Sequence, residues 1–281
     1  MLPQELKALE ITACKIRMDI LTATHAAKCG HPGGSLSAAD LFTYLYFHEL
    51  RVDPKNPQDP DRDRFVLSKG HTAPGLYSAL AERGFFPVED LKTLRRIDSY
   101  LQGHPNMNHV PGVDMSTGSL GQGISCACGM AKGGKYRNKD FRVYTLLGDG
   151  ELAEGQVWEA AMSAAKYKLD NLCAFVDLNG LQIDGKTADV MPTAPVDKKF
   201  EAFNWNVLTV DGHDCAAVAD ALEQAKAAQG RPTVILARTV KGKGVSFMEN
   251  NAGWHGKAPN DEQYEQAMAE LRAALAQLEV N

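Results

Sequence analysis

The sequence lacks the features that mark membrane proteins and nucleic-acid-binding proteins. No apolar stretch approaches the roughly 20 residues that span a bilayer, and the N-terminal stretch MLPQELKALE is acidic and amphipathic, unlike a secretory signal. The net charge is -5 and no run of like charges exceeds a few residues. This pattern argues against a polybasic membrane anchor or a nucleic-acid surface. We therefore expect a cytoplasmic protein with neither a membrane nor a nucleic acid as partner.

Closely spaced cysteine pairs are also absent. The six cysteines show no C-x-x-C spacing, and most lie in apolar segments such as NLCAFVDL. This usage is typical of reduced, buried thiols, so we predict no disulfide or metal chemistry for them. The remaining composition, 44% hydrophobic and 23% charged, is that of an ordinary globular protein. We expect a single large domain over residues 1–281.

Apolar periodicity predicts helices near both ends of the chain. Apolar residues from Leu6 to Ala27 recur at three- and four-residue steps, which places them on one face of a long helix, with Gly30 as its stop. Further helices are predicted over residues 37–49 and 261–278.

The pattern changes from about residue 141 to short β-type runs separated by helical ones. FRVYTLL, NLCAFVDL, NWNVLTV and TVILART read as strands, and QVWEAAMSAAKYKL reads as a helix. Strands that alternate with helices in this way indicate an α/β fold with a doubly wound, mostly parallel sheet. In such a sheet, ligands bind beyond the carboxyl ends of the strands.

Polar residues follow two of these predicted strands. FRVYTLL ends in Gly148-Asp149-Gly150, and Asn179 follows the next strand thirty residues later. One carboxylate and one amide oxygen suit Mg²⁺ when phosphate oxygens complete the shell. Gly150 lets backbone amides approach a phosphate at the start of the next helix. The sequence therefore predicts a metal and diphosphate site at this edge of the sheet.

The same stretch, GDGELA, also matches the dinucleotide-binding pattern G-x-G-x-x-G/A. That interpretation places Asp149 against a pyrophosphate without a metal, and Glu151 and Glu154 add two further negative charges nearby. A metal-bridged diphosphate tolerates this acidity better, so we prefer it. A Gly-Asp-Gly turn with an unrelated Asn is the third alternative.

Four of the eight histidines lie beside glycine in loop-like segments: His31, His71, His104 and His255. Each taken singly reads as a packing or capping residue. As a cluster they suit the deprotonation and reprotonation of sugar hydroxyls, because imidazole exchanges protons near neutral pH. For His213, between a strand and a helix, we predict a role in a turn and cap.

The Gly-Asp-Gly element with Asn179 resembles the thiamine diphosphate motif, and the histidine segments with Thr117-Gly-Ser-Leu-Gly-Gln-Gly123 resemble those of the transketolase family. The resemblance implies that Asp149, Asn179 and the carbonyl of Leu181 bind Mg²⁺ or Ca²⁺. It implies that thiamine diphosphate is contacted by His71, Gly118, Ser119, Leu120, Gly150, Asn179, Lys241 and His255. His31, His104 and His255 would line the donor-sugar channel as catalytic residues, and Glu154, grouped with the cofactor site, would lie at a subunit contact. Ser119 departs from the proline that transketolases often have there.

The resemblance covers only the first domain of a full transketolase. In that family, the glutamate that activates the cofactor and the arginines that bind sugar phosphate lie on later domains, and only about two dozen residues follow His255 here. This implies a partner chain with the pyrimidine-binding and C-terminal domains, in a heterotetramer with two copies of each chain. The implied reaction transfers a two-carbon ketol unit from a ketose phosphate to an aldose phosphate. The alternatives are a subunit similar to 1-deoxyxylulose-phosphate synthase or 2-oxo-acid dehydrogenase, or a non-catalytic cofactor-binding subunit.

Overall fold

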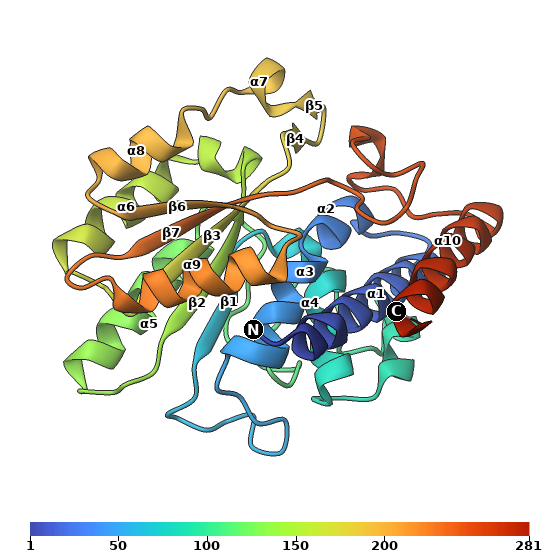
Figure 1. Cartoon of the computed structure of the whole chain (residues 1–281), viewed down its shortest axis with the longest axis horizontal. Coiled ribbons are helices and arrows are strands. Elements are labelled where there is room, and N and C mark those ends of the chain that lie inside the picture. Colours follow the sequence, from blue (N-terminus) through green and yellow to red (C-terminus); the bar gives the residue numbers. More distant parts are fainter. Residues whose placement is uncertain (281) are drawn as a thin grey trace.

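Five parallel strands form the central sheet of the computed structural model, which describes residues 1–280 (Figure 1). Their spatial order is β1-β2-β3-β7-β6. The prediction of a doubly wound, mostly parallel α/β fold is confirmed. The strands span β1 (Arg64–Leu67), β2 (Val143–Gly148), β3 (Leu172–Leu178), β6 (Asn206–Asp211) and β7 (Thr233–Arg238), and a separate antiparallel pair joins β4 (Leu181–Gln182) to β5 (Gly185–Lys186).

The sheet is covered on both faces because its strand residues point alternately to two apolar clusters. In β2, Tyr144 and Leu146 face one cluster, while Val143 and Leu147 face the other. Such strands read as almost continuous apolar runs because neither face is in water. The first cluster packs against α1 (Pro3–Ala27), α3 (Ala39–Tyr44), α4 (Ala73–Arg83), α9 (Cys215–Ala227) and α10 (Asp261–Val280). The second packs against α5 (Gly123–Tyr136), α6 (Gly155–Lys166) and α8 (Val196–Ala202).

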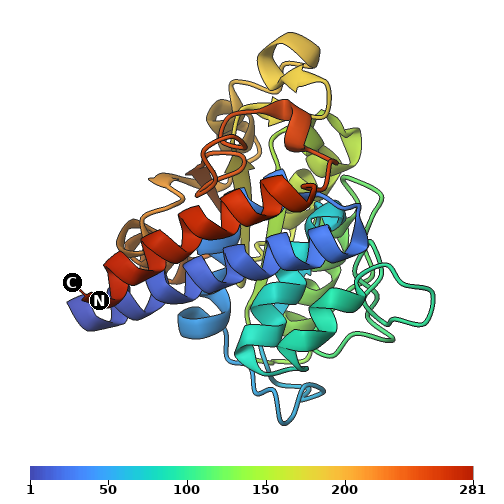
Figure 2. The same cartoon turned by 90° about the vertical axis from the view of Figure 1, so that its right-hand side faces the viewer.

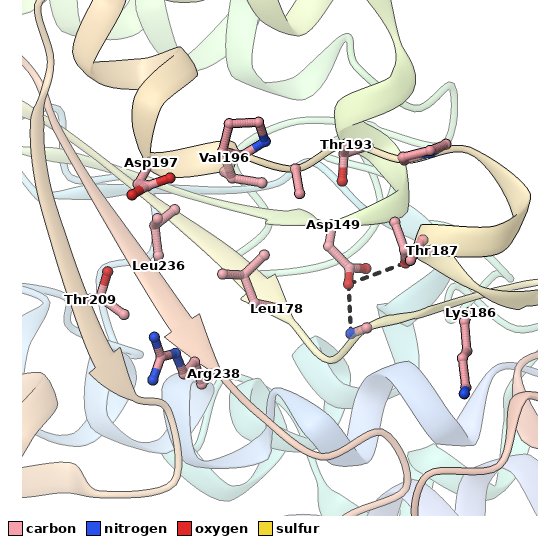
Figure 3. A pocket seen from close by; sticks show the side chains of 15 residues that line it. Asp149, Leu178, Lys186, Thr187, Thr193, Val196, Asp197, Thr209, Leu236 and Arg238 are labelled. Carbon is pink, nitrogen blue, oxygen red and sulfur yellow. Dashed lines mark hydrogen bonds between the residues drawn. The ribbon is translucent and has the colours of Figure 1, made fainter.

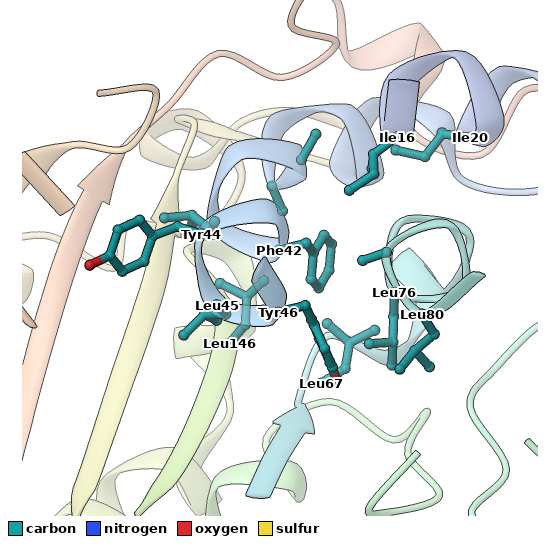
Figure 4. Packing of buried hydrophobic residues seen from close by; sticks show 14 of the residues in the cluster. Ile16, Ile20, Phe42, Tyr44, Leu45, Tyr46, Leu67, Leu76, Leu80 and Leu146 are labelled. Carbon is teal, nitrogen blue, oxygen red and sulfur yellow. The ribbon is translucent and has the colours of Figure 1, made fainter. Parts of the chain in front are cut away.

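Figure 4 shows the first cluster, where Phe42 of α3 lies between Ile16 of α1, Leu76 of α4 and Leu146 of β2. All four side chains are buried. Burying a side chain of this size contributes about 1.5–3 kcal/mol. This packing fixes α3, and with it the preceding segment 32–38, against the sheet.

The predicted first helix is confirmed, and α10 lies along it (Figure 2). The stop was placed slightly late, because Lys28 adopts a left-handed φ of 54° and donates its N–H to the His25 carbonyl before Gly30 is reached. The predicted closing helix over residues 261–278 is also confirmed and ends at Val280.

The helix predicted over residues 37–49 is wrong in its start and its continuity. A short helix α2 (Pro32–Ser37) precedes α3, the two are separated at Ala38, and Leu45–Glu49 forms a π-helical turn. Pro32 suits the first turn of a helix, where its missing N–H is not needed. The chain also forms α7 (Thr187–Val190) and short 3-10 turns at Gly70–Thr72, Val88–Thr93, Gly150–Ala153 and Ala252–Trp254.

The six cysteines form no disulfide in the structure. All six thiols are free, and four of them, Cys14, Cys128, Cys173 and Cys215, are buried. Among residues 1–280, no helix combines the length and the apolar character required to cross a bilayer.

Candidate active site at the carboxyl edge of the sheet

A cavity of about 300 Å³, here called the histidine cavity, opens beyond the carboxyl ends of β2 and β3. This is the edge at which parallel sheets bind ligands. Most of the residues predicted to form the site line it together: His31, His71, Gly118, Leu120, Asp149, Gly150, Asn179, Leu181, Lys241 and His255.

Asp149 follows β2 and hydrogen-bonds two loops. Its Oδ1 accepts from the Gly150 amide at 2.8 Å, and its Oδ2 accepts from the Gly180 amide at 2.6 Å. Burial, together with the nearby Asp177 carboxylate, raises the pKa of Asp149 to about 6. A cation placed at this carboxylate would offset that cost, since an opposite charge favours the ionised form.

Asn179 and Leu181 present two further oxygen atoms in the loop after β3. The Asn179 side-chain amide donates to Asp177 Oδ2 at 3.1 Å, and its Oδ1 accepts from the Leu181 amide at 3.1 Å. The Leu181 carbonyl accepts from Lys241 Nζ at 3.3 Å. The three oxygen donors predicted to bind a metal therefore line one cavity.

A buried ion pair that the sequence did not reveal supports this loop. Asp177 is fully buried, pairs with Lys69, and accepts from Ser37 Oγ at 2.5 Å and from the Thr239 hydroxyl. Burial alone would raise the pKa of Asp177, but Lys69 and these hydrogen bonds outweigh it and keep the pKa low. Asp177 orients Asn179, since the same carboxylate accepts the Asn179 amide.

Glu151 joins three segments around the cavity. It is buried and accepts hydrogen bonds from Ser68 Oγ at 2.5 Å, the Gly121 amide at 2.8 Å and the Gly148 amide at 3.0 Å. Burial raises the pKa of this carboxyl. The hydrogen bonds of Glu151 fix the segment after Gly118 against the end of β2.

Three of the four predicted histidines form a compact cluster. The ring centroids of His31, His71 and His255 lie 5.1–5.4 Å apart. Burial lowers their pKa values to about 4, about 2 and about 3 respectively, and nearby cations add to the effect: Arg95 at His31, Lys69 at His71 and Lys241 at His255. All three imidazoles are therefore neutral at pH 7.

Lys241 contacts this cluster directly. Its Nζ lies 2.9 Å from His255 Nδ1, and burial and Lys69 lower its pKa to about 8. Because an ammonium can only donate, Nδ1 of His255 is the acceptor and the ring proton is on Nε2.

The remaining predicted residues lie outside the lining. His104 is exposed and lies beside Gly118, where an added Cβ would be only 3.2 Å from the His104 ring. Ser119 is exposed, and Glu154 is exposed at the N-cap of α6. The cap predicted at His213 is wrong: His213 lies in the turn, but Asp214 accepts the capping hydrogen bonds of α9.

Asp149 also lines a second cavity, of about 510 Å³ (Figure 3). Thr187 Oγ1 donates to Asp149 Oδ2 at 3.3 Å there, beside the Gly180 amide. Its apolar lining includes Leu178 and Leu236. No pattern in the sequence indicated this cavity.

The donor chemistry of the histidine cavity fits a metal-bound diphosphate. No group of three or more His, Cys, Asp or Glu among residues 1–280 could bind a metal, so phosphate oxygens would have to complete a shell begun by Asp149, Asn179 and Leu181. The buried atoms His31 Nδ1 and Gln182 Nε2 line the cavity region without partners among the described residues. A Cβ atom at position 150 would lie only 2.9 Å from Gln182 Cβ, so glycine lets the chain at position 150 pass close to Gln182.

Comparisons with known proteins show which family the chain belongs to. Residues 10–276 match the family model described as transketolase, thiamine diphosphate binding domain. The 6-deoxy-6-sulfo-D-fructose transketolase subunit SqwG of Clostridium sp. (strain MSTE9) is 49% identical over 86% of this chain and 88% of that protein. An apulose-4-phosphate transketolase subunit from Phocaeicola vulgatus is 41% identical over 98% of each chain.

A solved transketolase from Pichia stipitis, in a complex with xylulose 5-phosphate, superimposes with a TM-score of 0.88 at 32% identity. The match covers 97% of this chain but 44% of that one, so the chain spans less than half of that transketolase. The family match, the subunit-length relatives and the shared fold lead to one assignment: the chain belongs to the transketolase family and corresponds to its thiamine diphosphate-binding domain.

Proposed function

We propose that this chain is the cofactor-binding subunit of a two-chain transketolase that transfers a two-carbon ketol unit between sugars. The observation that carries the proposal is the histidine cavity. Three neutral imidazoles, the Lys241 ammonium and the Asp149 carboxyl group line it together. Thiamine diphosphate, when bound, supplies the electron sink for carbon-carbon bond cleavage.

The acidic end of the cavity is the proposed metal and diphosphate site. Asp149, Asn179 and the Leu181 carbonyl would bind Mg²⁺ or Ca²⁺, with Gly150, His71 and Lys241 near the phosphates. Lys241 supplies positive charge near the diphosphate, whereas the charge of Lys69 is paired with Asp177. Gly118 to Leu120 would contact the aminopyrimidine ring.

The neutral histidines are suited to proton transfer at sugar hydroxyls. A neutral imidazole has one N–H donor and one acceptor nitrogen, so it can give a proton to one oxygen and accept one from another. In His255 the proton is on Nε2, because Lys241 donates to Nδ1. We assign His31 and His255 to this role in the cavity and His104 to the adjoining channel.

A partner chain is part of the proposal. Two relatives of similar length are named as transketolase subunits, and this chain spans 44% of a single-chain transketolase. Ile183 lines the histidine cavity yet is 64% exposed, and Glu154 is exposed beside Gly121. We propose that a chain bearing the pyrimidine-binding and C-terminal domains covers these residues, in a heterotetramer with two copies of each chain.

The substrate is proposed to be a ketose with an anionic terminus. The names of the relatives include a sulfonated sugar and a phosphorylated one. The partner chain would supply the residues that bind this anionic terminus. The choice between the two terminal groups is therefore tested by offering the complex both a phosphorylated and a sulfonated ketose.

The test reconstitutes the chain with a candidate partner chain and follows ketol transfer. Xylulose 5-phosphate and 6-deoxy-6-sulfofructose serve as donors and ribose 5-phosphate as acceptor, with Mg²⁺ and thiamine diphosphate present. Asp149→Asn should abolish metal-dependent cofactor binding, whereas Asp189→Asn, an exposed aspartate in α7, should leave it unchanged. Turnover by the isolated chain would contradict the two-subunit proposal, and cofactor binding that survives Asp149→Asn would contradict the metal assignment.

A further inference from the structure

The turn that carries Lys241 into the histidine cavity is fixed by hydrogen bonds at each of its ends. It spans residues 240–244 and has positive φ at Gly242 (81°) and Gly244 (92°). The Gly242 amide donates to the Gly33 carbonyl at 3.0 Å, which joins the turn to the start of α2. Lys241, the second residue of this turn, contacts His255 Nδ1 and the Leu181 carbonyl.

His213 contacts the first end of the turn. Its Nε2 accepts from the Val240 amide at 2.8 Å, so the proton of the neutral ring is on Nδ1. That Nδ1 lies 2.6 Å from Asp40 Oδ2, the acceptor for its proton. Both side chains are largely buried, at 14% and 10% exposure.

Arg17 contacts the other end. Its Nε donates to the Lys243 carbonyl at 3.1 Å, and its two terminal nitrogens bond to the two oxygens of Asp40 at 3.1 and 2.5 Å. Asp40 therefore joins Arg17 of α1 to His213 in one network. A bidentate, charge-assisted pair of this kind fixes the positions of both groups.

We propose that Arg17, Asp40 and His213 are positioning residues, which fix the turn at Val240 and Lys243 and thereby place Lys241 against His255. The alternative is that the network only joins α1 to α3. That alternative does not account for its ends, since both terminate on backbone atoms of the turn that carries Lys241. Through Lys241, the network determines which nitrogen of His255 bears the proton. The part of the proposal that concerns cofactor affinity rests on the proposed function.

The first test needs no cofactor. Histidine and valine are labelled with ¹⁵N in the full chain, and NMR reports the tautomer of His255 and the exchange rate of the Val240 amide. In His213→Ala, the Val240 amide should exchange about fivefold faster, and His255 should lose its single Nε2–H tautomer. His213→Gln should restore both signals, because Gln Oε1 can accept from the Val240 amide. Lys241→Met should change His255 without changing Val240.

The second test measures thiamine diphosphate binding with Mg²⁺ by calorimetry, on this chain reconstituted with the partner chain of the proposed function. We expect an affinity loss of about tenfold in His213→Ala, the size usual for groups that orient ligands, and recovery in His213→Gln. His109→Ala, at an exposed histidine, is the matched control and should match the wild type in every measurement.

The proposal is overturned if His255 keeps its tautomer in His213→Ala. It is also overturned if His213→Gln restores the melting temperature but not the two NMR signals, which would mark a merely structural role. The predicted NMR changes support the proposal whether or not the cofactor binds. Failure of the wild type to bind it contradicts the proposed function alone.

Discussion

Replacing His71 should change how the stability of the protein depends on pH. His71 has an ordinary pKa of 6.5, which its burial beside Lys69 and the other two histidines lowers to about 2. On acidification, the unfolded chain therefore takes up a proton at this residue that the folded chain does not. The free energy of unfolding falls as the pH drops below 6.5, because the unfolded state then binds more protons.

The magnitude follows from the two pKa values. Between pH 7 and pH 5, proton uptake by His71 in the unfolded state lowers the free energy of unfolding by about 2 kcal/mol. This value holds for any folded-state pKa below about 4, because the folded ring is then still neutral at pH 5. His31 and His255 act in the same direction, so the contribution of His71 must be obtained by difference.

The assay is urea unfolding of the wild type and His71→Asn at pH 5, 6 and 7, without cofactor. The loss of stability between pH 7 and pH 5 should be about 2 kcal/mol smaller in the variant. His109→Asn, at an exposed histidine, should match the wild type. Equal losses in His71→Asn and wild type would refute the reasoning, since they would mean that His71 titrates alike in both states.

Three further substitutions test the buried parts of the site and core. Asp177→Asn should lower the free energy of unfolding in urea by about 3–5 kcal/mol, because it leaves the buried Lys69 ammonium unpaired. Adding Lys69→Met should recover most of this loss, and no recovery would argue against the ion pair. Gly242→Ala should lower the melting temperature and reduce the free energy of unfolding by more than about 1 kcal/mol, because φ is 81° and a Cβ would clash with the Met248 carbonyl. An unchanged melting temperature would mean that the turn relaxes freely. Phe175→Ala should cost about 3–5 kcal/mol at a fully buried position in β3, and a cost below about 1 kcal/mol would contradict the packing described.

The sheet was largely predictable from the sequence because strands buried on both faces are long apolar runs. β1 was missed for the opposite reason: Arg64–Leu67 is only four residues long and lies between a charged loop and Ser68-Lys69-Gly70. Helix α2 was also missed, because its Pro-Gly-Gly start reads as part of a loop, and the predicted helix therefore began only at residue 37.

In the site, the rule that ligands bind at strand ends brought Asp149 and Asn179 together correctly, although their roles stay predictions. The same rule could have identified Asp177, which lies near the end of the predicted strand NLCAFVDL, but not Lys69, because β1 itself was missed. Their pairing depends on contacts between segments distant in sequence, which no local pattern encodes. Glu151 was missed for a similar reason: its hydrogen-bond partners come from three separate segments.

The lining of the histidine cavity comes from segments spread from His31 to His255, most of the length of the chain. Such a cavity exists only when all of these segments are in place at once. A ligand bound there at a hundred times its dissociation constant stabilises the whole folded chain by about 2.7 kcal/mol, because the unfolded chain offers it no site. Ligand occupancy thus reports complete folding of the chain, and a copy with any lining segment misplaced would be left both unliganded and more exposed to degradation.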